Sequence, residues 1–155
     1  MEDNKYSTEF FIIRDIDETN RPQAFDLAWR IFNKFEAPEY SEKSIESFRN
    51  ALHNSEFISQ LRIYGAFNNE KIVGMLATRN NGDHIALFFV DDRFHRKGIG
   101  GRLFETALNN CLSKEITVNS SPYAVGVYHA LGFIITDVEK ISDGIRYIPM
   151  IYKRD

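Results

Sequence analysis

The sequence predicts an α/β fold, of α+β arrangement, in which one mixed central β-sheet of about seven strands is flanked by four helices. Two observations support this prediction. Short apolar runs bounded by turn residues alternate with segments of helical periodicity, in the order β-α-α-β-β-β-α-β-α-β-β. One run, His84–Val90, is apolar after its first residue, which predicts a central strand buried on both faces. The 155 residues contain no repeat or linker, so we expect a single domain over residues 1–155.

The N-terminal part is expected to hold a strand followed by a helix. Phe10–Ile13 is a short apolar run and predicts the first strand. Thr19 or Asn20 caps the helix, which carries Pro22 in its first turn. This helix is expected to end before Pro38, because proline disfavours helical geometry in the residue that precedes it.

Ser41 caps a second predicted helix, whose apolar side chains lie along one face, and three strands follow it. The strands are expected at Leu61–Phe67, Ile72–Thr78 and His84–Val90. Asn81 and Gly82 both accept a positive φ, so they predict a hairpin turn into the last of these strands.

The C-terminal half continues the alternation of helices and strands. The expected elements are a helix over Ile99–Leu112, a strand over Ile116–Val118, a helix capped by Ser121 and ended by Gly132, and strands over Phe133–Thr136 and Ile145–Tyr152. Asp143 and Gly144 predict a hairpin turn into the last strand. Pro149 has no N–H to donate, which predicts a sheet edge or a bulge there. This strand, with Tyr147 and Tyr152, is also a candidate homodimer contact.

Composition excludes several classes of function. The formal net charge is −3, so nucleic acid and an anionic membrane surface are poor candidate partners. The longest apolar run, Ile85–Val90, is far shorter than the roughly 20 residues of a transmembrane helix. The single cysteine, Cys111, lies on the apolar face of its helix, which predicts a buried thiol and excludes a disulfide and a cysteine-based zinc cluster. The acidic N-terminus has no signal-peptide pattern, so the chain is expected to be cytoplasmic. The protein is also expected to hold no metal.

A basic, glycine-rich turn is the most informative segment of the chain. Residues 93–102 contain four arginine or lysine residues and no acidic residue, together with Gly98, Gly100 and Gly101. The turn joins the predicted central strand to the following helix, whose first-turn N–H groups are free to bind an anion. Glycines also let the backbone approach such an anion closely. We therefore expect a small phosphate-bearing ligand here, and a solvated basic turn is the alternative.

Two common phosphate motifs do not fit this turn. A P-loop requires Gly-Lys-Ser/Thr, whereas Lys97 here precedes Gly98 and Ile99. A dinucleotide fingerprint requires a third glycine at position 103, which is Leu103. A nucleotide-binding enzyme is therefore disfavoured.

The turn resembles the first signature of the GNAT (GCN5-related N-acetyltransferase) family, Gln/Arg-x-x-Gly-x-Gly/Ala. Residues 95–100, His-Arg-Lys-Gly-Ile-Gly, follow this pattern, except that His95 stands where Gln or Arg is usual. Residues 119–133 resemble the family's later motif, in which Asn119 follows the fifth strand and precedes a helix with Tyr128 and then Leu-Gly-Phe. The resemblance covers nearly the whole chain and implies a GNAT-like fold.

The resemblance also implies that acetyl-CoA binds as co-substrate. Strands four and five of such folds splay apart, so the free edge of Leu87–Val90 pairs with the pantetheine amides while the turn holds the pyrophosphate. A backbone N–H near Phe89 or Val90 would stabilise the oxyanion. A simple strand-end role is the alternative for Asn119. The expected coenzyme-binding residues are Phe88, Phe89, Val90, His95, Arg96, Lys97, Gly98, Ile99, Gly100, Gly101 and Asn119.

For catalysis, the resemblance implies that Tyr128 protonates the departing thiolate, and a core aromatic residue is the alternative. The group that deprotonates the amine stays open between a side chain and a chain of water molecules. Glu36, Glu39 and Tyr40 lie in the loop that borders the acceptor site in this family. A carboxylate there could bind a cation, or the loop could simply be solvated. His84 is a further candidate at the far end of the central strand.

The resulting functional prediction is transfer of an acetyl group from acetyl-CoA to a primary amine of a small molecule or peptide. The amine attacks directly in a ternary complex, without a covalent enzyme intermediate. Acidic and aromatic residues at positions 35–40 favour a cationic amine or a basic peptide end. The alternative is a non-catalytic acyl-CoA-binding or regulatory module of the same fold.

Overall fold

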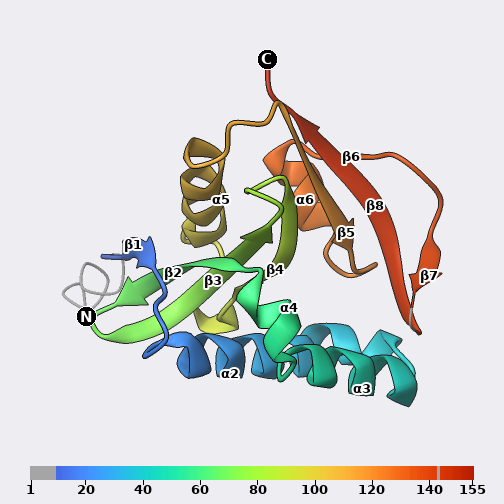
Figure 1. The fold of residues 1–155 in the computed structure, drawn as a ribbon, viewed down its shortest axis with the longest axis horizontal. Helices are drawn as coiled ribbons and strands as arrows, with labels where there is room; N and C mark the ends of the chain where they lie inside the picture. Colours follow the sequence, from blue (N-terminus) through green and yellow to red (C-terminus); the bar gives the residue numbers. More distant parts are fainter. Residues whose placement is uncertain (1–9, 143) are drawn as a thin grey trace.

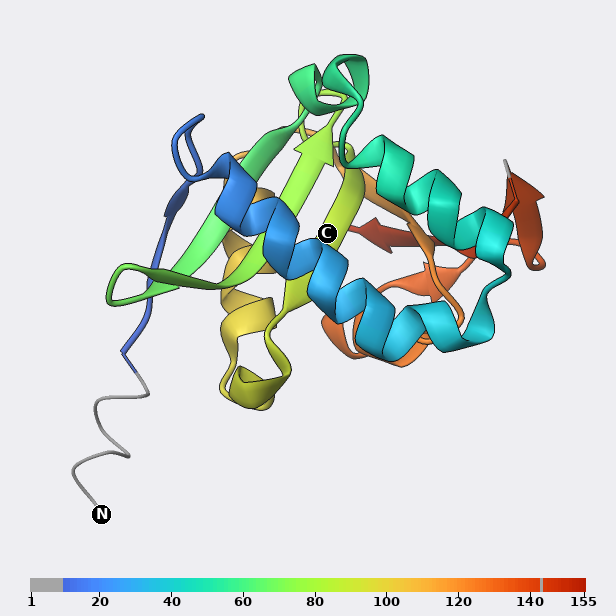
Figure 2. The same cartoon turned by 90° about the horizontal axis from the view of Figure 1, so that it is seen from below.

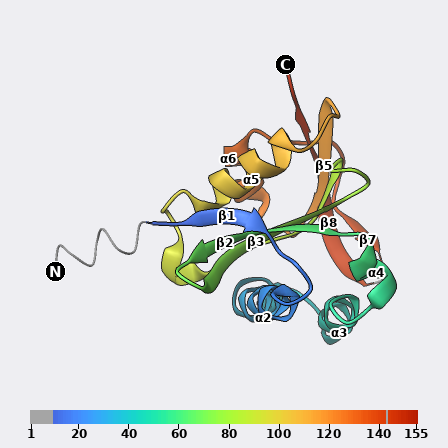
Figure 3. The same ribbon diagram turned by 60° about the vertical axis from the view of Figure 1, so that its left-hand side comes forward.

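The computed structural model describes residues 10–142 and 144–155, which form one mixed sheet with helices on both faces (Figures 1 and 3). The strand order is β1-β2-β3-β4-β5-β8-β6, with β7 paired to β8. All pairs are antiparallel except β4 with β5. The strands are β1 (Ile12–Asp15), β2 (Arg62–Asn68), β3 (Lys71–Arg79), β4 (His84–Val90), β5 (Glu115–Ser120), β6 (Ile134–Ile135), β7 (Lys140–Ser142) and β8 (Ile145–Lys153).

The helices cover the two faces in pairs. α2 and α3 lie along one face, and α5 and α6 lie along the other (Figures 2 and 3). The predicted element order is confirmed, and the structure adds α4 and β7. No helix in the described ranges is long and apolar enough to cross a membrane. The helices are α2 (Arg21–Ile31), α3 (Glu42–Ala51), α4 (Ser55–Ser59), α5 (Ile99–Asn109) and α6 (Val125–Leu131), with a π-helical turn η1 (Phe32–Glu36) and 3-10 turns η2 (Ala37–Glu39) and η3 (Asp92–Phe94).

Local side-chain chemistry explains where several helices begin and end. Pro22 lies in the first turn of α2, as predicted, whereas Asn20 precedes the helix without the predicted side-chain capping bond. The hydroxyl of Ser41 accepts a hydrogen bond from the N–H of Ser44 at 3.1 Å and so caps α3. Gly132, with φ of +109°, ends α6 in the left-handed conformation that glycine adopts without strain.

Some boundaries differ from the prediction. α6 begins at Val125 rather than at Ser121, because the N–H of Ala124 bonds to both the carbonyl and the hydroxyl oxygen of Ser121 in a preceding turn. The edge predicted at Pro149 is present only locally: β8 lies between β5 and β6, but Pro149 pairs with Asn119 of β5 and has no partner in β6. Asp143, in the predicted hairpin turn, lies outside the described residues.

The parting of β4 from β5 is the feature that shapes the rest of the sheet. Just after the two positions at which β4 pairs with β5, the register between β4 and β3 shifts, so that Ala86 has no partner in β3. β4 then continues with β3, whereas β5 continues with β8 (Figure 1). From Leu87 onward, the side of β4 that faces β5 is free of strand pairing. The shared pairs of β4 and β5 are His84 with Thr117 and Ile85 with Val118.

This parting corrects the prediction that β4 is buried on both faces. Leu87 and Phe89 are buried in the apolar layer against α2 and α3. Phe88 and Val90 on the other face are only half-buried, because they border the open side.

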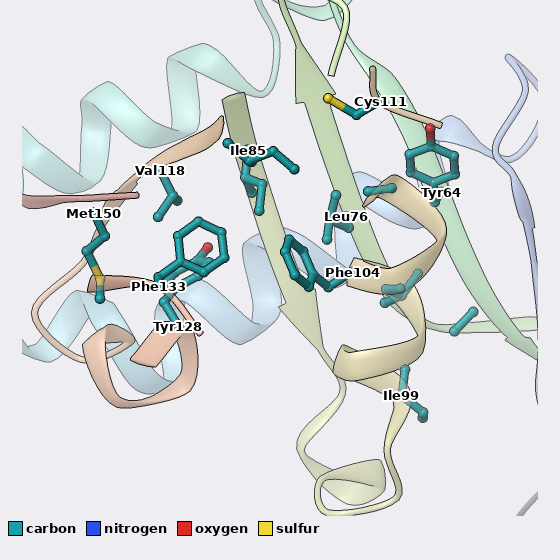
Figure 4. Packing of buried hydrophobic residues seen from close by; sticks show 14 of the residues in the cluster. Tyr64, Leu76, Ile85, Ile99, Phe104, Cys111, Val118, Tyr128, Phe133 and Met150 are labelled. Carbon is teal, nitrogen blue, oxygen red and sulfur yellow. The ribbon is translucent and has the colours of Figure 1, made fainter. Parts of the chain in front are cut away.

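Two apolar layers hold the sheet between the helices. On the α5 and α6 face, Phe104 packs against Phe133 with ring centroids 5.4 Å apart, and Phe133 packs against Tyr128 at 5.4 Å (Figure 4). Cys111 is buried in the same layer, as predicted. A second layer fills the space between the sheet and α2 and α3. The packing on Phe133 fixes the position of α6 and, with it, the ring of Tyr128.

A buried carboxylate fixes the segment that follows β4. Asp91 is 0% exposed and accepts hydrogen bonds from Nη2 of Arg93 at 2.8 Å and Nη2 of Arg30 at 2.9 Å. Burial raises the pKa of Asp91, but the hydrogen bonds from Arg93 and Arg30 outweigh it and hold the pKa well below its usual range. Because Arg30 belongs to α2, this network ties the segment after β4 to the helix layer.

Asp91→Asn should lower the free energy of unfolding by about 2 to 3 kcal/mol at neutral pH, because two arginines lose a buried ionic acceptor. Since the pKa is depressed in the folded state, the difference should be constant above about pH 5 and shrink below about pH 4. Urea denaturation across this pH range measures it. Asp15→Asn is the control, because its ion pair with Arg62 is exposed. A loss below about 0.5 kcal/mol would contradict the role of Asp91.

Candidate active site

Two cavities meet on the open side of β4. The turn cavity, of about 340 Å³, is bounded by the second half of β4, the turn of residues 94–100 and the start of α6. The α3 cavity, of about 420 Å³, lies among β4, η1, α3 and the first residues of β8. We call the residues that line both cavities the junction. They are Glu36, Phe88, Phe89, Ala124 and Tyr128.

The turn cavity ends at the glycine-rich turn. Gly98 immediately precedes α5 with φ of +81°, a conformation that strains other residues. The N–H groups of residues 99–101 lie in the first helical turn and have no helical acceptor. Arg96 and Lys97 are exposed beside them, whereas Arg93 is held in the carboxylate network that follows β4. Free N–H groups, open space and positive charge fit a phosphate or diphosphate.

His95 is held against the free edge of β4. Its Nε2 lies 2.9 Å from the carbonyl oxygen of Val90, so His95 donates this hydrogen bond when the proton is on Nε2. Its ring packs on Phe35 at 5.9 Å, and Phe35 stacks on Tyr123 at 5.5 Å. Together these three rings join η1, the turn and the segment before α6.

The wall between the turn and the junction is mostly apolar. An extended chain with amide groups can lie along it, with its amides facing the unpaired backbone groups of β4. The residues present therefore fit a ligand that combines a diphosphate with a long amide-containing arm. The apolar lining residues are Ile31, Phe88, Val90, Phe94 and Val127.

Glu36 and Tyr128 both line the junction, and the charge of Glu36 acts on the hydroxyl of Tyr128. The π-helical turn η1 ends at Glu36, before the chain continues into η2. Burial raises the pKa of Glu36 from 4.5 to about 7; a hydrogen bond with the Ser121 side chain opposes this change, and the charge of Glu39 adds to it. Burial and the charge of Glu36 raise the pKa of Tyr128 above its ordinary value of 10. Near neutral pH, Tyr128 is therefore protonated and Glu36 populates both of its forms.

The α3 cavity has aromatic walls and is flanked by a hydrogen-bonded loop. The hydroxyl of Tyr40 donates to the carbonyl oxygen of Arg146 at 3.0 Å, and burial raises the pKa of Tyr40. The side chain of Arg146 donates to Glu139 at 2.6 Å and to the carbonyl oxygen of Glu39 at 3.1 Å. These bonds join η2 to β8. The aromatic lining residues outside the junction are Phe32, Tyr40, Phe48, Phe57 and Tyr147.

The structure does not bring His84 to the junction. It lines a separate cavity at the end of β4 that still pairs with β5, and its Nδ1 lies 2.8 Å from Oγ1 of Thr117. Burial and the charge of Arg79 lower the pKa of His84 to about 4. The expectation that His84 contacts the acceptor thus finds no support in the fold, because strand pairing holds it at the closed end.

Other predicted residues also differ in position. Asn119 lines the α3 cavity rather than the turn cavity. Lys97 and Gly101 are exposed beside the turn cavity without lining it. Glu39 is exposed and reaches the α3 cavity wall only through its carbonyl bond to Arg146.

Several residues at the site were not predicted from the sequence. Ser121 was expected only to cap a helix, yet its side chain bonds to Glu36. Phe35 and Tyr123 bridge the turn cavity from elements distant in the chain. No periodicity marks them, and the only available signal is that Ser121 and Tyr123 follow Asn119 closely.

Comparisons with known proteins agree with this geometry. A family model described as "Acetyltransferase (GNAT) domain" matches residues 36–154. The fold is similar to a GCN5-related N-acetyltransferase from Rhodopseudomonas palustris, with a TM-score of 0.79, 16% identity and coverage of 92% of this chain and 94% of the other. It is also similar to PaiA N-acetyltransferase from Thermoplasma acidophilum, solved with coenzyme A (TM-score 0.68, 22% identity, coverage 93% and 99%). YjaB from Escherichia coli gives a TM-score of 0.75 at 20% identity, with coverage of 94% and 99%.

The carboxyl carbon of Glu36 should titrate near pH 7 in NMR spectra, because burial raises its pKa to about 7, and Glu36→Gln should remove this transition. Since the pKa is raised in the folded state, wild type should lose stability relative to Glu36→Gln as the pH rises from about 4.5 through 7. The exposed Glu46→Gln is the control and should show no such trend. A midpoint for Glu36 below about pH 5 would contradict its burial at the junction.

Proposed function

Because this chain belongs to the GNAT family of acetyltransferases and is an acetyl-CoA-dependent N-acetyltransferase, we propose that acetyl transfer to a primary amine takes place at the junction. The acceptor is a small molecule or a peptide, and its amine attacks directly in a ternary complex. One observation carries the proposal: the junction residues line both cavities. A thioester that enters along the turn cavity and an amine that enters through the α3 cavity would meet there.

The donor half of the proposal assigns acetyl-CoA to the turn cavity. N–H groups of residues 99–101 and the charges of Arg96 and Lys97 hold the diphosphate. The edge of Phe88–Val90 pairs with the pantetheine amides as an added strand would. His95, bonded to the last carbonyl of that edge, positions the strand rather than the diphosphate. Bound in this way, the co-substrate supplies its acetyl group at the junction.

The acceptor half of the proposal assigns the two proton transfers. Glu36 in its ionised form accepts the proton of the attacking amine, directly or through water, since its pKa of about 7 suits a base near neutral pH. Tyr128 stays protonated and donates to the departing thiolate. Of the two expected donors, the alternation of the β3–β4 ladder directs the N–H of Val90 to the open side, and this N–H stabilises the charge that develops on the thioester oxygen. Asn119 lines the acceptor side and is assigned to acceptor contact.

The proposal extends to organisation and location. The continuous sheet from β1 to β8 supports a single N-acetyltransferase domain. A cytoplasmic location is supported by the buried, unpaired thiol of Cys111. A homodimer with a contact at β8, through Tyr147 and Tyr152, stays a prediction that measurement of the oligomeric state tests.

An acceptor screen tests the function itself. The protein is incubated with acetyl-CoA and a panel of amines, free thiol is followed continuously, and acetylated products are detected by mass. Thiol release matched by an acetylated amine is expected. Tight coenzyme A binding without product on any amine would instead indicate a non-catalytic acyl-CoA-binding module.

Tyr128→Phe should lower kcat by about 100-fold or more, because the variant loses the proton donor for the thiolate. Coenzyme A affinity, measured by calorimetry, should stay close to wild type, since the ring that packs on Phe88 and Phe133 is kept. Tyr152→Phe, which alters a tyrosine that also packs on Phe133, is the matched control. Unchanged turnover in Tyr128→Phe would remove this residue from the mechanism.

A further inference from the structure

The α3 cavity contains an arginine that the fold leaves without a partner. Arg79, the last residue of β3, lines this cavity, and its buried Nε has no hydrogen-bond partner. In the described ranges its guanidinium makes no hydrogen bond or ion pair. Arg146 on the same cavity is fully engaged with Glu139 and the Glu39 carbonyl. A partly desolvated guanidinium without an acceptor is unfavourable, so this group is suited to receive an anion.

Strand register places Arg79 far from the junction. Arg79 pairs with His84 at the closed end of β4, whereas Phe88 of the junction pairs with Leu76. Arg79 lies three residues beyond Leu76 along β3, which corresponds to ~10 Å at ~3.3 Å per residue, because β4 carries the extra unpaired residue Ala86. Arg79 also borders a cavity on the α5 side together with Thr78. Successive strand residues point to opposite faces, and Ala77, two residues before Arg79, belongs to the apolar layer against α2 and α3, so Arg79 lies on the face that carries the α3 cavity.

The cavity between these two ends is aromatic. Phe48 of α3 and Phe57 of α4 line its wall, and neither ring carries a polar group. The cavity thus offers a carboxylate, Glu36, at the junction, aromatic side chains in its wall, and the cation of Arg79 about three strand residues away from the junction. This polarity matches an amine whose own anionic group is separated from it by a spacer.

Resting on the proposed function, we propose that the acceptor is an amine that carries a distant carboxylate, which Arg79 binds through its two-pronged guanidinium. An ω-amino acid and a short peptide with a free C-terminus share this chemistry. A free α-amino acid does not, because its amine and carboxylate are too close to reach both ends of the cavity. The proposal refines the expectation of a purely cationic acceptor.

Matched acceptor pairs test the proposal. The first pair is aminooctanoate and octylamine, and the second is triglycine and triglycine amide. For wild type, kcat/KM should be at least about tenfold higher for the acid of a pair, as a charged hydrogen bond of ~1.5–3 kcal/mol implies. Arg79→Gln should bring this ratio close to one by raising KM for the acid, and Arg79→Lys should retain part of it. A preference for the acid in the first pair alone identifies the acceptor as an ω-amino acid. A preference for the acid in the second pair alone identifies it as a peptide.

Arg62→Gln is the control, because Arg62 is a neighbouring arginine that pairs with Asp15 and does not line the α3 cavity. It should leave the acid-to-neutral ratio unchanged. Circular dichroism and coenzyme A titration establish that each variant is folded.

The outcomes separate the two proposals. Turnover without an acid preference, or a preference that survives in Arg79→Gln, overturns the role of Arg79 and leaves acetyl transfer intact. No turnover on any amine contradicts the proposed function. In that case, calorimetry measures the binding of aminooctanoate to the protein in the presence of coenzyme A. Binding to wild type that Arg79→Gln abolishes supports the anion site. The absence of binding to wild type overturns it.

Discussion

Every element of the site depends on the separation of β4 from β5 after Ile85. Both strands remain paired on their other sides, β4 with β3 except at Ala86 and β5 with β8, so the sheet opens while these strand pairs are kept. The opening leaves backbone N–H and C=O groups of β4 unpaired, which is costly unless water or a ligand satisfies them. A ligand that supplies amide groups along this edge completes the sheet, so the same defect that weakens the empty fold creates the binding surface.

The ion pairs that stabilise the fold near the opening do not include the residues that are proposed to bind the ligand or to transfer protons. Asp91 is neutralised by Arg93 and Arg30, which fixes the segment after β4 and leaves Arg96 and Lys97 for an anionic ligand. At the junction there is no such neutralising cation among the junction residues themselves. Burial raises the pKa values of Glu36 and Tyr128, so a proton acceptor and a proton donor coexist near neutral pH.

Local rules explain why much of the fold could be read from the sequence. The cap at Ser41, the left-handed Gly132 and the glycine-rich turn depend on residues close together in the chain, and the structure has all of them. Long-range packing explains what could not be predicted. The contact of Ser121 with Glu36 and the free guanidinium of Arg79 exist only after distant elements assemble.

Position along a strand was also a poor guide to function where pairing was unknown. His84 belongs to the same strand as the junction residues, but it lies on the paired end of β4 rather than the open one. Pro149 suggested an edge, yet β8 tolerates it inside the sheet because the neighbouring strand β6 spans only Ile134–Ile135. Both differences arise because a sequence gives the order of strands and not the length over which each pair stays bonded.

The most direct test is a crystal structure of the protein with coenzyme A. The diphosphate should lie on the N–H groups of residues 99–101, the pantetheine amides should pair with Phe88–Val90, and the sulfur should lie beside the hydroxyl of Tyr128. Coenzyme A bound away from the turn, or β4 and β5 paired along their whole length in the complex, would contradict this arrangement.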